Sequence, residues 1–282
     1  MSYLKQAQKP PSEAPMVTVI GSPGAGKTSY AGTFPDAIFI QAENAGTVFE
    51  NWDADVQPLL MPIIPKAHAD AAGNITHSPR DVLMAQVREL VTEDHGFKTL
   101  IVDSITAMNT KLEHELALRD KVESVADAAG GFHKGYDVIA KWHADFIYAC
   151  DVLRKRKGMA IVFLAHSGVE KIKNSPDEAS EYNVYSLDMH KKSAALYASS
   201  SDAVFYIKKE GFISGAATNN KGQTTKYGRI METGQRQLIT TGDGRTGYVL
   251  AKNRYNMPPE LDLNKGENPA LQYIKHFNQG AV

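Results

Sequence analysis

The stretch Gly21-Ser22-Pro23-Gly24-Ala25-Gly26-Lys27-Thr28 decides how we interpret this chain of 282 residues. An apolar run, residues 16–20, precedes it and suits a buried strand, and residues 27–33 are expected to be helical. The stretch matches the pattern G-x-x-x-x-G-K-[ST] in full and has the strand and the helix that this pattern requires on its two sides. Glycines allow the backbone N–H groups of such a turn to curl around phosphate oxygens. The sequence therefore predicts a phosphate-binding loop.

The residue types of this loop indicate its ligand. We expect Lys27 to reach the β- and γ-phosphates of a nucleoside triphosphate and the Thr28 hydroxyl to hold Mg²⁺. The alternative is a glycine-rich turn that binds nothing, and the strand and helix on its two sides argue against it. ATP and Mg²⁺ are therefore the expected cofactors. The expected nucleotide contacts in the loop are Gly21, Ser22, Pro23, Gly24, Ala25, Gly26, Lys27, Thr28 and Ser29.

Composition excludes several classes of protein. The formal net charge is −1, and 43% hydrophobic with 22% charged residues is ordinary globular usage. The single cysteine, Cys150, cannot form an intramolecular disulfide, which excludes a secreted disulfide scaffold. No apolar run reaches the ~18–20 residues of a membrane helix, and the N-terminus lacks the apolar core of a signal peptide. We expect a soluble, cytoplasmic protein that does not bind a membrane.

Apolar runs and helical spacing alternate along the chain. We expect strands at residues 37–40, 58–64, 99–102, 159–165 and 202–207, helices starting at Ser78-Pro79 and over 104–120 and 136–155, and loops at 66–77 and 167–193. A part richer in Gly, Thr and Tyr predicts antiparallel strands at 226–232, 237–240 and 248–251. The fold class predicted is α/β, a mainly parallel sheet flanked by helices with a C-terminal antiparallel extension. Residues 1–15 are expected to be a flexible arm, 16–258 the folded domain and 259–282 a tail.

An aspartate follows the apolar strand Leu100-Ile101-Val102. In a sheet that carries a phosphate-binding loop, Asp103 would lie next to the first strand and order the Mg²⁺ through water. Taken alone, an aspartate at this place is usually a helix cap, a role that Ser104 could fill equally well. The loop upstream favours a metal-organising role for Asp103.

Two further polar residues are expected at the same edge of the sheet. Glu43 follows the strand 37–40, where its carboxylate could polarise the water that attacks the γ-phosphate. His166 ends the strand 159–165, where it could sense the γ-phosphate and pass its state to the segment that follows. The alternatives are a solvated loop glutamate for Glu43 and a capped or core histidine for His166.

The order of these motifs resembles the RecA/RadA recombinase core over about residues 16–257. The phosphate loop is followed by a strand with Glu43-Asn44, by Ile101-Val102-Asp103-Ser104 and by the strand that ends in His166. Recombinases commonly carry glutamine in place of His166, and we expect no counterpart of their separate N-terminal domain in this sequence. The chain is most similar to the short, single-domain RecA-like ATPases of bacteriophages, which act in single-strand annealing or as recombination mediators. The weaker later motifs of that group resemble residues 188–192, 202–204 and 251–258.

The resemblance implies two segments that face DNA, residues 122–137 and 167–192. Aromatic and basic side chains on such segments suit a single strand, because they stack on bases and neutralise phosphates. Asp177, Glu178 and Glu181 weaken the basic signal of the second segment, and the alternative is a solvated surface loop. The expected DNA contacts are Phe132, His133 and Lys134 in the first segment and Lys171, Lys173, Lys191 and Lys192 in the second.

The resemblance also implies assembly into a ring or filament. Lys252 and Arg254 stand where basic residues of RecA-like filaments reach the nucleotide of a neighbouring subunit and stabilise the transferring phosphoryl group. The alternative is a pair of exposed charges on a hairpin. If the chain is phage-encoded, the compartment is the bacterial host cytosol, and a single-stranded DNA-binding protein is a candidate partner.

The leading hypothesis is an ATPase, DNA-stimulated and Mg²⁺-dependent, that binds single-stranded DNA and promotes annealing or homologous recombination. The alternative is a nucleotide-switched adaptor or helicase loader that acts through a protein partner and hydrolyses little. A small-molecule kinase is disfavoured, because the sequence shows no clear arginine-rich lid. Turnover of ATP with and without single-stranded DNA separates the first two.

Overall fold

Strand β1, Met16–Gly21, is fully buried and lies in the middle of a mixed sheet. The computed structural model describes residues 13–173, 181–215, 217–218, 224–226, 228–242 and 249–278. The strands are β1 Met16–Gly21, β2 Ala37–Gln41, β3 Leu59–Leu60, β4 His68–Ala69, β5 Ile75–His77, β6 Thr99–Asp103, β7 Ala160–Ile172, β8 Tyr182–Leu187, β9 Ala203–Ser214, β10 Ala217–Thr218, β11 Thr224–Lys226, β12 Arg229–Ile239, β13 Lys252–Asn253 and β14 Glu260–Asp262. The helices are α1 Lys27–Gly32, α2 Gly46–Phe49, α3 Pro79–Thr92, α4 Ile105–Asp120, α5 Gly135–Lys157 and α6 Lys191–Ser200, with 3-10 turns at Leu271–Tyr273 and Lys275–Phe277.

The sheet has the order β14-β12-β9-β1-β7-β6-β2-β3. Strands β9, β1, β7, β6, β2 and β3 pair in parallel, whereas β12 and β14 add antiparallel strands at one side. The central strands are apolar runs because helices cover both of their faces. The predicted fold class, a mainly parallel α/β sheet with a C-terminal antiparallel extension, is confirmed.

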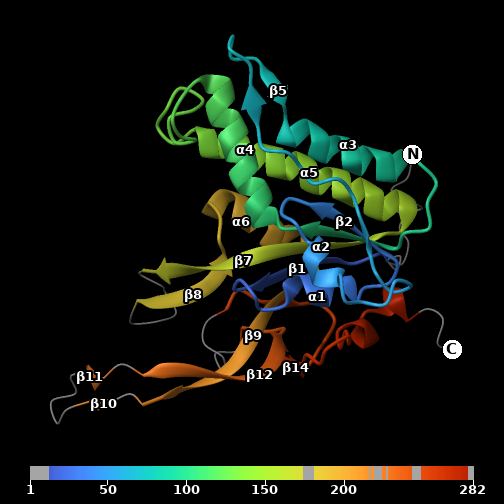
Figure 1. Cartoon of the computed structure of the whole chain (residues 1–282), viewed down its shortest axis with the longest axis vertical. Helices are drawn as coiled ribbons and strands as arrows, with labels where there is room; N and C mark the ends of the chain where they lie inside the picture. The colour runs from blue at the N-terminus through green and yellow to red at the C-terminus, as the bar shows by residue number, and fades with distance from the viewer. Residues whose placement is uncertain are drawn as a thin grey trace, which may run out of the picture.

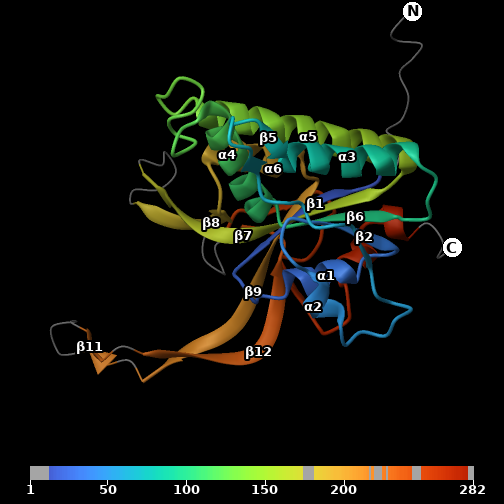
Figure 2. The same ribbon diagram turned by 45° about the horizontal axis from the view of Figure 1, so that its top comes forward.

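Two layers of helical or irregular chain enclose the sheet. Helices α3, α4, α5 and α6 lie on one face, and α1, α2 and the C-terminal segment lie on the other (Figures 1 and 2). Alternate residues of each strand enter separate cores: Ile20 and Phe163 pack under the four helices, whereas Val19 and Leu164 pack against α1 and the C-terminal segment. This two-sided burial fixes the register of the strands.

The register brings the carboxyl ends of the parallel strands to one edge. Gly21 at the end of β1 lies opposite His166 of β7 on one side and Ile207 of β9 on the other. At the end of β2, Gln41 lies opposite Asp103 of β6. Ligands of open α/β sheets bind at this edge, so the topology gathers the polar residues predicted there.

Two hairpins leave the sheet on the same side of the molecule (Figure 1). One is β7–β8, and the other is β9–β12. Our prediction of a loop over residues 167–193 was wrong, because β7 continues to Ile172, β8 pairs with it and α6 begins at Lys191. A half-exposed hairpin has little apolar alternation to reveal it. Residues 174–180, with Asp177 and Glu178, lie outside the described residues.

The C-terminal strands also differ from the sequence-based expectation. The strands predicted at 226–232 and 237–240 form one strand, β12, whose pairing with β9 shifts between Glu232 and Arg236. In place of a strand at 248–251, Val249 makes a single bridge to Tyr185 and β13 follows. Residues 227 and 248 lie outside the described part of the chain.

Both ends of the described chain pack on the same domain. The amide of Ile161 donates to the Pro15 carbonyl at 2.9 Å. Strand β14 pairs with β12, and Ala270 and Ile274 are buried, so residues 259–278 join the core rather than trail from it. The expected arm at residues 1–12 and the last four residues, 279–282, lie outside the described part. Within the described part, every helix is too short or too polar to cross a bilayer.

Candidate nucleotide site

The phosphate loop connects β1 to α1 in a conformation that needs glycine. Gly24 and Gly26 have φ of 71° and 96°, in the left-handed region. The Lys27 ammonium turns back into the loop and donates to the carbonyl oxygens of Gly21 and Ser22 at 2.9 and 3.1 Å. Burial lowers the pKa of Lys27, although Asp103 and Glu43 oppose the shift. Because Gly24 and Gly26 have no Cβ, a ligand can approach the loop backbone closely, and the buried Lys27 ammonium supplies a positive charge. These two features fit a polyphosphate.

Thr28 and Asp103 meet beside this loop. The Thr28 hydroxyl donates to the Asp103 carboxylate at 2.7 Å, and Asp103 is only 3% exposed. Burial raises the pKa of Asp103 to about 6, with the Thr28 hydrogen bond acting against the shift. A hydroxyl and a carboxylate are the hard oxygen donors that Mg²⁺ prefers, and its charge would favour the ionised form of Asp103. The two residues fit a magnesium ion and would hold it.

The cap of helix α4 is Ser104 and not Asp103. Ser104 is the N-cap of α4, and its hydroxyl oxygen accepts from the Ala107 amide at 3.2 Å. The cap therefore uses Ser104, while the side chain of Asp103 points to Thr28. Thr106, in the first turn of α4, accepts from the backbone amide of His166 at 3.0 Å and so joins this helix to the end of the sheet.

His166 lies between Lys27 and Glu43. Lys27 Nζ approaches His166 Nδ1 at 3.4 Å, and His166 Nε2 lies 3.2 Å from Glu43 Oε1. An ammonium can only donate and a carboxylate can only accept, so both contacts are satisfied by the neutral ring with its proton on Nε2. Hydrogen bonding from His166, assisted by Ser104, lowers the pKa of Glu43 against the opposing effect of burial. Glu43 is thus held as an anion at the site, with its side chain 43% exposed.

Two cations that we did not predict from the sequence, Arg236 and Lys209, border the loop from the side of β9. A Cβ added to Gly26 would lie 2.7 Å from Arg236 Nη1, and one added to Gly24 would lie 3.8 Å from Lys209 Nζ. Lys209 comes two residues after the strand predicted at 202–207, and this place beyond the carboxyl end of the predicted strand was a usable signal. Arg236 had none, because it depends on the long-range pairing of β12 with β9.

The chain matches the protein family described as an AAA domain over residues 13–255, most of its length. The chain belongs to this family. It is therefore a nucleotide-binding P-loop ATPase of the AAA type. No curated protein matches the chain.

In this AAA domain, Lys252 and Arg254 lie away from the phosphate loop of the same subunit. Lys252 lies opposite Val204 in β9, at the amino-terminal edge of the sheet. Its ammonium donates to three carbonyl oxygens at the end of α6, those of Ala198, Ser199 and Ser201. These contacts give Lys252 a capping role within its own subunit.

The side chain of Arg254 is more available than that of Lys252 for contact with another subunit. Its guanidinium donates to Asp202 at 3.1 Å, and its side chain is 60% exposed. The Asp202 carboxylate also accepts hydrogen bonds from Arg154 and from the Met16 amide, so it keeps two partners if Arg254 moves away. The action of both cations on a neighbouring nucleotide stays a prediction.

The first candidate DNA segment of the AAA domain presents an exposed aromatic ring. Phe132 is 91% exposed, and both Phe132 and His133 have positive φ, 54° and 61°. Gly130 and Gly131 precede them with φ of 84° and 80°. Ala129 also has a positive φ, 55°, so five successive residues lie in the left-handed region shortly before α5, which begins after Lys134.

The second candidate segment lies against the first. The ring of Tyr136 stacks on His190 with centroids 4.2 Å apart and on His133 at 6.0 Å. Lys192 pairs with Asp137, and Lys171 pairs with Glu181, so two of the predicted cations are neutralised within the subunit. Among the described residues, no ion pair involves the other three exposed cations, Lys134, Lys173 and Lys191.

Proposed function

We propose that this AAA domain hydrolyses ATP with Mg²⁺, binds single-stranded DNA, and promotes annealing or homologous recombination. One observation carries the proposal: strand β7 holds His166 at the nucleotide site and continues directly into the hairpin that bears Lys171. A change at the phosphate site therefore has a short, hydrogen-bonded route to a candidate DNA surface.

The side chains at the loop support hydrolysis. Lys27 would contact the phosphates, and the anionic Glu43 can orient a water and accept its proton. Bound Mg²⁺ would supply neutralisation of the phosphate charge beside Thr28 and Asp103. His166 fixes the position of Glu43, because its Nε2–H donates to the carboxylate.

The same contacts suggest how phosphate binding could be sensed. Lys27 uses loop carbonyls and His166 Nδ1 as its acceptors. When the ammonium turns to phosphate oxygens, His166 Nδ1 loses a donor while Nε2 keeps its contact with Glu43. The backbone of β7 beyond His166 would then report the state of the site to the β7–β8 hairpin.

The surface chemistry supports a single strand as the partner. Phe132 offers an exposed face on which a base can stack, a contact worth about 1–3 kcal/mol per base. Lys134, Lys173 and Lys191, which form no ion pair within the described part of the chain, can neutralise phosphates, and this makes the affinity fall with salt. Assembly into a ring or filament on the DNA completes the proposal, and a single-stranded DNA-binding protein is a further candidate partner.

The decisive experiment measures ATP turnover with and without single-stranded DNA, together with DNA affinity at two salt concentrations. We expect stimulation by DNA in the unchanged protein, almost no turnover in Lys27→Ala, and DNA affinity about 10-fold lower in Phe132→Ala. Tyr148→Ala is the matched control, because Tyr148 is another exposed aromatic, 70% exposed, on the body of α5. Stimulation only by a protein partner, with no effect of DNA, would favour the adaptor or helicase-loader alternative.

A further inference from the structure

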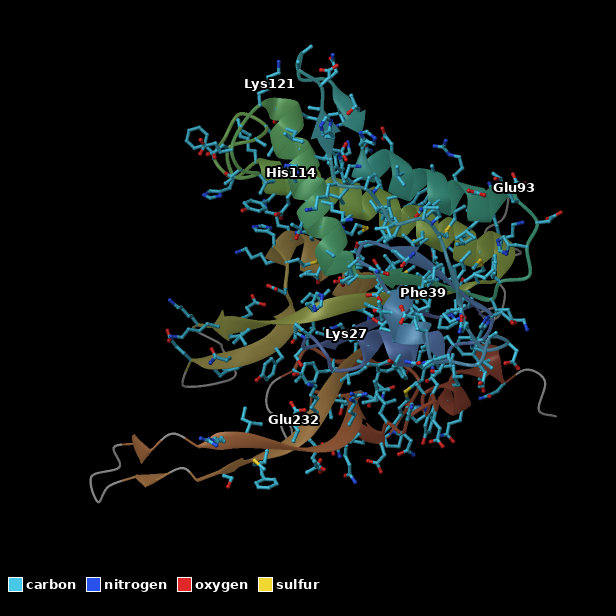
Figure 3. The ribbon with its side chains drawn as sticks, viewed as in Figure 1. Lys27, Phe39, Glu93, His114, Lys121 and Glu232 are labelled. Atoms are coloured by element: carbon cyan, nitrogen blue, oxygen red, sulfur yellow. The ribbon has the colours of Figure 1, made fainter. Side chains whose placement is uncertain are left out.

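Arg236 and Lys209 form a pair of basic side chains at the base of the β9–β12 hairpin. They lie directly opposite each other in the register of the two strands. The strand β9 is the neighbour of β1, so both side chains emerge beside the loop that follows β1. Figure 3 shows Lys27 above the place where this hairpin leaves the sheet, with Glu232 on β12 below it.

The guanidinium of Arg236 is packed against the backbone of the phosphate loop. A Cβ on Gly26 would meet Arg236 Nη1 at 2.7 Å and Cζ at 3.2 Å, so the group rests against the Cα of this glycine. Gly26 is also the residue that opens α1. The shift in pairing between Glu232 and Arg236, together with a φ of 84° at Gly234, marks a bulge that re-aims the strand here.

Arg236 has no counterion among the residues that the structure describes. Lys209 has one, since its Nζ lies 3.3 Å from Glu232 Oε1. Among the described residues, no hydrogen bond or ion pair involves the Arg236 side chain. The nearby loop offers Lys27 and backbone N–H groups, which add positive potential. An anion that both this exposed guanidinium and the loop can bind would be the most favourable partner at this position.

We propose that Arg236, assisted by Lys209, contacts the α- and β-phosphates of the nucleotide bound to its own subunit. Glu43, Asp103 and His166 approach the loop from the β7 side, where the γ-phosphate and Mg²⁺ are expected. Arg236 approaches from the β9 side, over Gly26, and so faces the part of the polyphosphate that the loop backbone cradles. Its planar fork suits two phosphate oxygens at once.

This inference rests on the proposed nucleotide site, and nucleotide affinity tests the two separately. ATP and ADP affinities are measured by titration calorimetry on the full chain, for the unchanged protein and for Lys27→Ala, Arg236→Ala and Arg236→Lys. We expect Arg236→Ala to weaken ATP and ADP alike, by about 10- to 100-fold, the range of a charge-assisted contact. Arg236→Lys keeps the charge but loses the fork, so its loss should be smaller.

Arg229→Ala is the matched control, because Arg229 begins the same strand and lies about 20 Å from Arg236 at the usual rise per residue. It should leave both affinities unchanged. Affinities in Arg236→Ala equal to those of the unchanged protein, while Lys27→Ala loses binding, would overturn this inference and leave the nucleotide site standing. A loss confined to ATP would overturn the assignment to the α- and β-phosphates. Failure of the unchanged protein to bind either nucleotide would overturn both.

Discussion

Glu43 shows how a single residue gains a role from neighbours that are far away in sequence. His166 and Ser104 lower the pKa of its carboxyl group, although partial burial acts in the other direction. The sequence predicted Glu43, Asp103 and His166 at one edge because the carboxyl ends of parallel strands meet there. The bridge of His166 between Lys27 and Glu43 could not be predicted, since it depends on rotamers that the pattern does not specify.

At this scale we expect Glu43→Gln to separate binding from catalysis. The amide keeps the volume of the side chain and can still accept from His166, but it cannot take a proton from water. We expect ATP affinity to stay within a few-fold and kcat to fall by about 100-fold, a typical general-base contribution. Turnover and equilibrium binding measured on the same preparation check this. If affinity falls and saturated turnover does not, Glu43 is a ligand contact.

Among the elements, three helices are joined by one buried histidine. His143 on α5 is fully buried, accepts from the Tyr197 hydroxyl of α6 at Nδ1 over 2.7 Å, and donates from Nε2 to Asn109 of α4 over 2.9 Å. Burial lowers the pKa of His143 to about 4. The neutral ring satisfies both neighbours, whereas a protonated ring would have to place a second N–H against the hydroxyl oxygen.

This network makes the stability of the helical layer depend on pH. An unfolded histidine titrates near 6.5, so between pH 6.5 and 4 the unfolded chain binds a proton that the folded chain does not. The contribution of His143 is complete above pH 6.5 and is lost as the pH falls towards 4, by about 3 kcal/mol in total. Urea unfolding at pH 7, 5.5 and 4.5 should show His143→Gln with a flatter pH dependence than the unchanged protein. His114→Gln, at an exposed position of α4, is the control. Parallel curves for all three proteins would contradict the assignment.

The helices and central strands were predictable because their signals are local. Ser78 caps α3 and Pro79 begins it, as the sequence indicated. The hairpins were not predictable, since β7 beyond Ala165 and β8 are stabilised mainly by each other and show little apolar alternation. Helix α6 was missed because it has a weak apolar face, although Ala194 and Tyr197 are buried.

On the scale of the whole molecule, two arginines, Arg236 and Arg254, lie at opposite edges of the sheet. Arg236 lies at the phosphate loop, at the carboxyl edge of the sheet. Arg254 follows β13, which pairs with the first residues of β9 at the opposite edge. The length of β1, about 15 Å or more at the usual rise per residue, lies between Arg254 and its own loop. We therefore predict that Arg254 contacts a nucleotide only across an interface, in the site of a neighbouring subunit.

Mixing two impaired variants tests this separation directly. In a mixture of Lys27→Ala and Arg254→Ala, about one interface in four joins an intact loop to an intact Arg254 from its neighbour. A cation supplied across an interface can be worth ~10³–10⁵ in rate, so turnover of the mixture should clearly exceed the sum of the two separate preparations. The matched control mixes Lys27→Ala with Arg236→Ala: both residues serve the same site in one subunit, so no arrangement restores an intact site. Native mass spectrometry verifies that the variants assemble together. Recovery in the control mixture would place Arg236 across the interface, and no recovery in the first mixture would leave Arg254 with its ion pair to Asp202 alone.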